Sequence, residues 1–165
     1  MDFFRNITKW YRAKDWYRSK ASGLAGLLIL FALQFQLPFL SFVHTLIPAF
    51  FTLIGIAAFG YFLNDFGDQK DDIKSGSTNT VFGLKWYSKL GLLITSLGLA
   101  LLPWYYLPFT EVTLWLLLAE FGLFIVYSLK PFKLKRVAFL GVLIDSLYAH
   151  ALPTFLAAYT FCIIS

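Results

Sequence analysis

The chain has 165 residues, of which 59% are hydrophobic, 20% aromatic and only 14% charged, and its mean hydropathy is +0.69. Soluble globular domains are about 45–50% apolar and about 25% charged, so this composition excludes an ordinary soluble fold and predicts an integral membrane protein. The formal net charge is +5, but the bases are divided among separate segments, so no single patch indicates a nucleic-acid partner.

Residues 1–20 alternate basic side chains with aromatic ones, such as Trp10, Tyr11, Trp16 and Tyr17. Trp and Tyr favour the headgroup layer of a bilayer, and Lys and Arg favour its anionic cytoplasmic leaflet. We therefore predict that residues 1–20 form an interfacial helix on the cytoplasmic face of the membrane, and not a nucleic-acid surface.

Residues 21–165 are expected to form one transmembrane domain. Because a spanning helix needs about 20 largely apolar residues, five spans are predicted, near residues 21–37, 46–63, 87–106, 111–128 and 137–164. Every Lys and Arg lies in residues 1–20, 70–89 or 130–136, whereas residues 38–45 and 107–110 contain none. Basic and uncharged connections thus alternate, which predicts a cytoplasmic N-terminus. The expected fold is an all-α, multi-pass bundle of about five spans in a cell or inner membrane.

Four acidic residues gather at the predicted cytoplasmic end of the second span: Asp65, Asp68, Asp71 and Asp72, preceded by Asn64. On a helix, Asp65, Asp68 and Asp72 fall within about 60° of one another. Such a stripe is repulsive and is disfavoured near a helix C-terminus, unless a cation relieves the repulsion. Magnesium prefers one or two carboxylates, waters and a substrate phosphate. The stripe therefore predicts a metal-bridged diphosphate site; the alternative is a set of solvated acids at a helix end.

Two segments carry a resemblance to a known family. The segment Asn64-Asp65-Phe66-Gly67-Asp68-Gln69-Lys70-Asp71-Asp72 resembles the NDxxDxxxD motif of the UbiA superfamily of intramembrane prenyltransferases. The segment from Tyr127 to Lys135 resembles the YSxxPxRLK motif at the cytoplasmic end of that family's fourth helix. The two motifs agree with the family in order and sidedness, and together they correspond to about its N-terminal half.

The resemblance implies the function and the roles of individual residues. The function is magnesium-dependent transfer of a prenyl group from an isoprenoid diphosphate to an aromatic or other lipid-soluble acceptor. Asp65, Asp68 and Asp72 would be the catalytic magnesium ligands, and Asn64 would help them to hold the magnesium against the diphosphate of the substrate. Tyr127, Lys133 and Lys135 would contact the diphosphate. An aromatic-lined cavity that excludes water would protect the allylic cation that forms.

The sequence also departs from the family pattern. The family's second aspartate motif follows its sixth helix, and residues 1–165 contain no counterpart, because Ala149 stands four residues after Asp145. We therefore expect a missing C-terminal half or a partner chain to supply it. The alternative function is that of a non-catalytic half-length relative, either an assembly partner or a small transporter.

Four further residues are of types that can carry function: Glu120, Asp145, His150 and Cys162. Glu120 and Asp145 lie inside predicted spans, where an ionisable side chain suggests function; each is expected either to line the acceptor cavity or to pair with a neighbouring helix. His150 is expected to be a hydrogen-bonded structural residue, not the partner of Asp145. The single cysteine, Cys162, excludes an internal disulfide and is expected to be a small buried hydrophobe.

Overall fold

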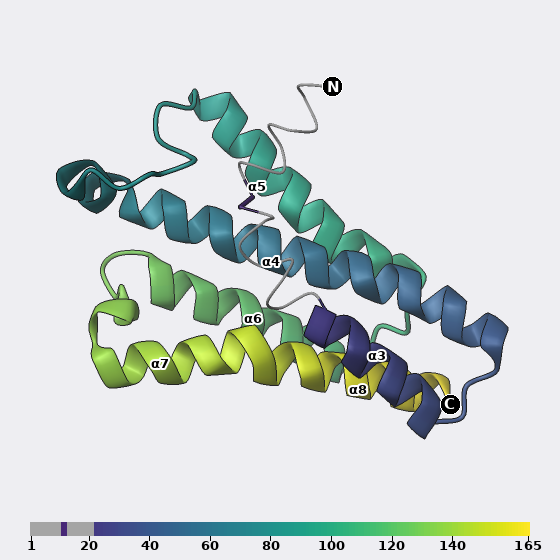
Figure 1. Cartoon of the computed structure of the whole chain (residues 1–165). Coiled ribbons are helices and arrows are strands. Elements are labelled where there is room, and N and C mark those ends of the chain that lie inside the picture. Colours follow the sequence, from purple (N-terminus) through teal and green to yellow (C-terminus); the bar gives the residue numbers. More distant parts are fainter. Residues whose placement is uncertain (1–10, 13–21) are drawn as a thin grey trace.

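The computed structural model describes residues 11–12 and 22–165, and within that part the chain is helical with no strand (Figure 1). The predicted interfacial helix over residues 1–20 lies outside the described residues, except for a turn at Tyr11 and Arg12. The elements are α3 (Ser22–Gln34), α4 (Phe39–Ser75), α5 (Trp86–Leu101), η2 (Leu102–Tyr105), α6 (Glu111–Ser128), η3 (Leu134–Arg136), α7 (Ala138–Ser146), η4 (Leu147–Ala151) and α8 (Leu152–Ile164).

The long helix α4 is the centre of the bundle. Its 37 residues correspond to about 55 Å, well beyond the roughly 30 Å of a bilayer's hydrocarbon core. It ends because Gly76 adopts a left-handed conformation (φ 69°). The N–H groups of Gly76 and Ser77 then bond the carbonyls of Ile73 and Asp72, which satisfies the last turn of the helix. The acidic segment is therefore a rigid helical extension and not a loop.

Glycines let two neighbouring helices approach α4 closely. A Cβ at Gly55 would lie 2.2 Å from the backbone nitrogen of Ala100 in α5. A Cβ at Gly60 would lie 2.2 Å from the ring of Phe124 in α6. The same helix pair is joined by an edge-to-face contact between Phe59 and Phe121, whose ring centroids are 4.8 Å apart. Close backbone approach without a side chain is how small residues bring membrane helices together.

The last span is one helix with an irregular turn in its middle. Segments α7, η4 and α8 follow one another without a break, and η4 is a π-helical turn in which the N–H of Leu152 bonds the carbonyl of Leu147. Pro153 follows directly and has no N–H to donate to Ala149, so a regular α-helical turn is not available there. The wider turn changes which side chains face the bundle.

Four helical segments are long and apolar enough to cross a membrane, at residues 39–75, 86–105, 111–128 and 138–164, as expected for an integral membrane protein. They coincide with four of the predicted spans. The first predicted span is shorter than expected, because α3 has 13 residues. The expected connection over residues 38–45 is also largely wrong: Pro38 precedes α4, and the chain is helical from Phe39 onwards, with Pro48 inside the helix.

The contact between Gly55 and Ala100 gives a first prediction. Replacing Gly55 with alanine should force α4 and α5 apart and lower the free energy of unfolding by about 1–3 kcal/mol, as overpacking does. Denaturant unfolding in detergent, followed by circular dichroism, would measure it. The matched control is Gly91→Ala in α5, where nothing lies within 4 Å of an added Cβ. Equal stability of the two variants would contradict the close packing.

Candidate functional site

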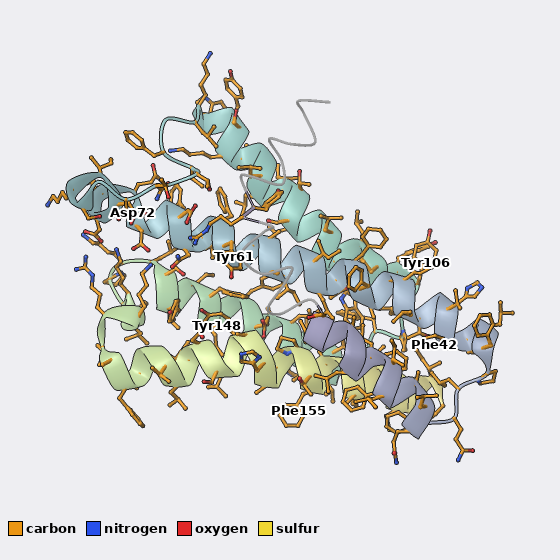
Figure 2. All side chains as sticks on the ribbon, viewed as in Figure 1. Phe42, Tyr61, Asp72, Tyr106, Tyr148 and Phe155 are labelled. Atoms are coloured by element: carbon orange, nitrogen blue, oxygen red, sulfur yellow. The ribbon has the colours of Figure 1, made fainter. Side chains whose placement is uncertain are left out.

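The carboxylates of the acidic segment divide between two loops. Figure 2 labels Asp72 near the end of α4 that lies beside both the α4–α5 and the α6–α7 connections, with Phe42 towards the opposite end. The side chains of Asn64, Asp68 and Asp71 bind the basic α6–α7 connection. Those of Asp65 and Asp72 bind the α4–α5 connection. The three carboxylates of the predicted stripe therefore bind different partners: Asp68 binds the α6–α7 connection, and Asp65 and Asp72 bind the α4–α5 connection.

The first group is an ion-pair cluster, which we define as Asn64, Asp68 and Asp71 with Lys133, Lys135 and Arg136. Lys133 Nζ lies 2.8 Å from Asp68 Oδ1, donates to the carbonyl of Gly67 at 3.1 Å and also pairs with Asp71. Lys135 Nζ donates to Asn64 Oδ1 at 2.7 Å and pairs with Asp68 Oδ2. Arg136 binds Asp71 at 2.6 Å. Two lysines thus share one carboxylate.

Backbone features at the end of α6 place these lysines. A Cβ at Gly67 would lie 2.3 Å from the carbonyl oxygen of Ser128, so only glycine lets the end of α6 rest on α4. The chain then turns through Pro131, and Lys133 adopts a left-handed conformation with φ 40°. This conformation is uncommon for a lysine. It accompanies a side chain that is only 5% exposed and is held on α4 by its ion pairs.

The pKa values of the two lysines are shifted in opposite directions. Burial lowers the pKa of Lys133, but its hydrogen bonds to Asp68 and Asp71 outweigh that effect, so the pKa is raised above its ordinary value. For Lys135, burial outweighs the hydrogen bond to Asp68, so its pKa is lowered. As pH rises, Lys135 is therefore the first of the two to lose its charge, and its hold on Asp68 weakens while Lys133 still binds.

Asp65 and Asp72 bind the α4–α5 connection and hold it against α4. Asp65 is 3% exposed, and its Oδ2 accepts from Thr80 Oγ1 at 2.6 Å and Thr80 N at 3.2 Å. Arg12 binds its Oδ1 at 3.2 Å and lies over the ring of Tyr61. Asn79 donates to Asp72 Oδ2 and to the Asp65 carbonyl, each at 2.7 Å. These two carboxylates therefore have structural partners within the chain.

A cavity of about 240 Å³ opens beside the ion-pair cluster, between α3, α4, α6 and the last span. At one end its wall is polar, with Tyr61, Asn64, Tyr127 and Asp145. Most of the other lining residues are apolar, such as Leu24, Phe50, Leu53, Ile54 and Pro153, and Arg12 and Ser128 also line the cavity. Figure 2 shows the labelled Tyr61 on α4 and Tyr148 on the last span, and both line this cavity. Its shape and polarity suit an amphiphile.

The structure therefore brings together Asn64, Asp68, Lys133 and Lys135, and it places Asn64 and Tyr127 in the cavity wall. Within the described residues, no three His, Cys, Asp or Glu side chains form a group that could hold a metal ion. Sequence reasoning missed Asn79, Thr80 and the contact of Arg12 with Asp65. An asparagine that accepts from the N–H groups of Val81 and Phe82 forms a local turn, and such residues are a recognisable turn signal.

The structure also places the four other residues that the sequence singled out, which are Asp145, Glu120, His150 and Cys162. Asp145 lines the cavity and binds Tyr148. Glu120 is 1% exposed, and neither carboxylate oxygen has a hydrogen-bond partner among the described residues. The expectation for His150 is wrong, because this residue is exposed and its imidazole side chain makes no hydrogen bond with any described residue. Cys162 is also exposed, contrary to expectation, because an apolar residue of a membrane helix can face lipid as well as the protein core.

Removing Lys133 should weaken the whole cluster. Lys133→Met leaves Asp68, Asp71 and the Gly67 carbonyl without this donor, so the free energy of unfolding should fall by about 2 kcal/mol. Denaturant unfolding in detergent measures the change. Lys130→Met is the matched control, since Lys130 is an exposed lysine of the same connection and its replacement should have little effect. A similar loss in both variants would show that the cluster does not stabilise the fold.

Asn79→Ala should release the α4–α5 connection from α4. We expect faster amide hydrogen exchange over residues 76–85, because the substitution removes the amide bonds to Asp72 and Asp65. Ser77→Ala is the control, since that exposed hydroxyl bonds only the hydroxyl of Ser75. Exchange rates in Asn79→Ala that match those of the unmodified protein would contradict this role.

Comparison with known proteins gives no relative: no protein-family model, no curated protein and no solved structure matches the chain. The site consists of an acidic helix extension, two connections that bind it and an amphiphilic cavity beside them.

Proposed function

We propose that this chain is the part of a magnesium-dependent membrane prenyltransferase that binds an isoprenoid diphosphate. The reaction would transfer the prenyl group to an aromatic or other lipid-soluble acceptor within the membrane. The second aspartate motif of the UbiA superfamily would come from a further segment of the protein or from a partner chain. The proposal rests on the two sequence motifs and on the way their residues meet in space.

The position of Asn64 is the observation that carries this proposal. Its side chain accepts a hydrogen bond from Lys135 in the ion-pair cluster, and the same residue lines the apolar cavity. The ion-pair cluster and the largely apolar cavity thus adjoin at one residue, which supports a site for a ligand that is anionic at one end and apolar at the other. A prenyl diphosphate is such a ligand, because its diphosphate is anionic and its chain is a hydrocarbon.

The arrangement suits ionisation of an allylic diphosphate. When the carbon–oxygen bond breaks, its electron pair leaves with the diphosphate, and Lys133 and Lys135 stand where they would stabilise that charge. The aromatic and aliphatic wall of the cavity would keep water from the allylic cation. Tyr127 lines the cavity and lies in the last turn of α6. The connection that contains Lys133 and Lys135 follows directly after this helix.

The donor atoms around Lys135 fit a magnesium ion. Asn64 Oδ1 and Asp68 Oδ2 already converge on one positive charge, the Lys135 ammonium, and Asp72 acts on the same lysine electrostatically. One carboxylate with an amide oxygen, completed by waters and phosphate, is a set that magnesium accepts. Asn64 and Asp68 would hold the ion, and Asp65 and Asp72 would add negative charge from neighbouring positions of α4. Bound there, magnesium would neutralise the diphosphate and bridge it to the helix.

The proposal includes a membrane arrangement of five spans with a cytoplasmic N-terminus and a cytoplasmic active face, in a cell or inner membrane. The confinement of all Lys and Arg to residues 1–20, 70–89 and 130–136 supports it. Helix α3 would be the first span together with its neighbouring residues, because 13 helical residues alone extend only about 20 Å. The ion-pair cluster would then lie at the cytoplasmic surface.

One observation favours the alternative of a non-catalytic relative, either an assembly partner or a small transporter. Asp68 and Asp71 are neutralised by the chain's own bases. If the site were purely structural, the lysine ammonium groups would permanently occupy the position that a magnesium ion would take in the enzyme. The two functions differ in one respect: only the enzyme needs the cluster to open for magnesium and diphosphate.

Binding of farnesyl diphosphate, with and without magnesium, tests the proposal. Magnesium should strengthen binding to the unmodified protein, and Asp68→Asn should lose at least about tenfold of that magnesium-dependent affinity, because it removes a charged ligand. Glu111→Gln, in the first turn of α6 and so at the other end of that helix, is the control and should bind normally.

Two results would count against the enzyme. Unchanged magnesium-dependent binding in both Asp68→Asn and Asp65→Asn would contradict the diphosphate site. Ion flux through proteoliposomes, with no diphosphate binding, would favour the transporter.

A further inference from the structure

A second polar site lies in the cavity wall on the last span, and the diphosphate site does not use it. Tyr148, which is 8% exposed, donates a hydrogen bond from its hydroxyl to Asp145 Oδ1. Both residues line the cavity. A carboxylate inside a membrane bundle is costly and by default indicates function.

The π-helical turn explains how these residues come to face the cavity. Asp145 is the last residue but one of α7, Tyr148 and Ala149 lie within η4, and Pro153 is the second residue of α8. All four of these residues line the cavity. A turn widened at a proline is a common way to place side chains at a binding site.

The Asp145 carboxylate retains a free acceptor. Tyr148 uses Oδ1, whereas Oδ2 makes no hydrogen bond with any described residue. An ionised carboxylate has about four acceptor positions, so a ligand with a hydrogen-bond donor would find this oxygen available at the cavity wall. The bond would be charge-assisted and therefore stronger than one between neutral groups.

The surroundings of Asp145 indicate which kind of donor fits. The ring of Tyr148 lies 4.3 Å from that of Phe124 and 5.1 Å from that of Tyr127, between centroids. This aromatic wall favours a flat ring on the ligand. Arg12 lines the same cavity, and its charge disfavours a cationic ligand. Asp145 itself repels an anionic one. A neutral aromatic hydroxyl satisfies all three conditions.

We propose that Asp145, oriented by Tyr148, binds the hydroxyl of a phenol-headed lipid whose apolar tail occupies the rest of the cavity. This inference deepens the proposed function and rests on it for the ligand's role, which would be that of the prenyl acceptor. Asp145 is then a specificity-determining residue, and Tyr148 is a positioning residue. The binding itself requires neither magnesium nor diphosphate, so it can be measured separately.

The test is a competition between two ligands that differ only at the hydroxyl. Detergent-solubilised protein is mixed with equal amounts of nonylphenol and nonylanisole, without magnesium or diphosphate, and native mass spectrometry measures the occupancy of each. Both ligands partition into detergent, so their ratio reports the hydroxyl contact. We expect the phenol to be favoured about tenfold, as for a hydrogen bond to a charged group.

Three variants assign that preference to the site. Asp145→Asn keeps the shape but removes the charge, so the preference should fall to about threefold or less; Asp145→Leu removes the acceptor and should abolish it. Ser146→Ala is the matched control, because that exposed hydroxyl bonds its own helix at Val142, and it should keep the full preference. The near-isosteric asparagine variant carries the test if the leucine variant does not fold.

Several outcomes would overturn the inference: equal occupancy by the two ligands, an unchanged preference in Asp145→Asn, or tighter binding of nonylamine than of nonylphenol. Failure of the two proposals is distinguishable. Magnesium-dependent binding of farnesyl diphosphate without a hydroxyl preference would overturn the phenol site alone. A hydroxyl preference without diphosphate binding would overturn the prenyltransferase and leave a phenol-binding membrane protein.

Discussion

The attachment of the α6–α7 connection to the acidic extension of α4, through the ion-pair cluster, is the constraint on which the rest of the site depends. Lys133 and Lys135 both reach Asp68, and Lys133 also binds the Gly67 carbonyl. These contacts hold the end of α6 and the start of α7 against α4. The cavity is bounded by these same helices, so its polar end depends on the same attachment.

This attachment is possible because the acidic segment is helical throughout. If the chain had left the helix near Asp65, its carboxylates would be spread along a solvated loop and would face no particular partner. Because α4 continues to Ser75, successive turns direct the acids towards two different connections. Attraction to the lysines and to the Asn79–Thr80 turn then offsets much of the repulsion among the carboxylates.

The cavity combines two requirements that a lipid bilayer makes difficult to reconcile. Its apolar part can remain between helices without cost, but its polar groups need partners where water is scarce. Asn64 is satisfied by Lys135, and Asp145 is bound by Tyr148. Glu120, Thr52 and Ser128, the last of which also lines the cavity, have buried oxygens without hydrogen-bond partners among the described residues, and nothing in the structure explains them. The satisfied groups lie at the cavity, where a ligand would meet them.

The amino-acid sequence by itself determined the helical membrane class, the last three spans to within a few residues, the existence but not the ends of the span in α4, and the positions of the acidic and basic segments. It could do so because long apolar runs and charge position are local properties that need no knowledge of neighbours. It could also place Asp65, Asp68 and Asp72 on one side of a helix, since that follows from 100° per residue.

Only the tertiary structure decided which carboxylate meets which base. Asp68 faces the lysines because Gly67 lets Ser128 approach α4, and Asp65 faces Thr80 because the next connection folds back along the helix. Likewise, the π-helical turn before Pro153 places Asp145 and Tyr148 in the cavity wall. Such contacts join residues far apart in the chain, and a side chain's direction around its own helix does not say what packs against it.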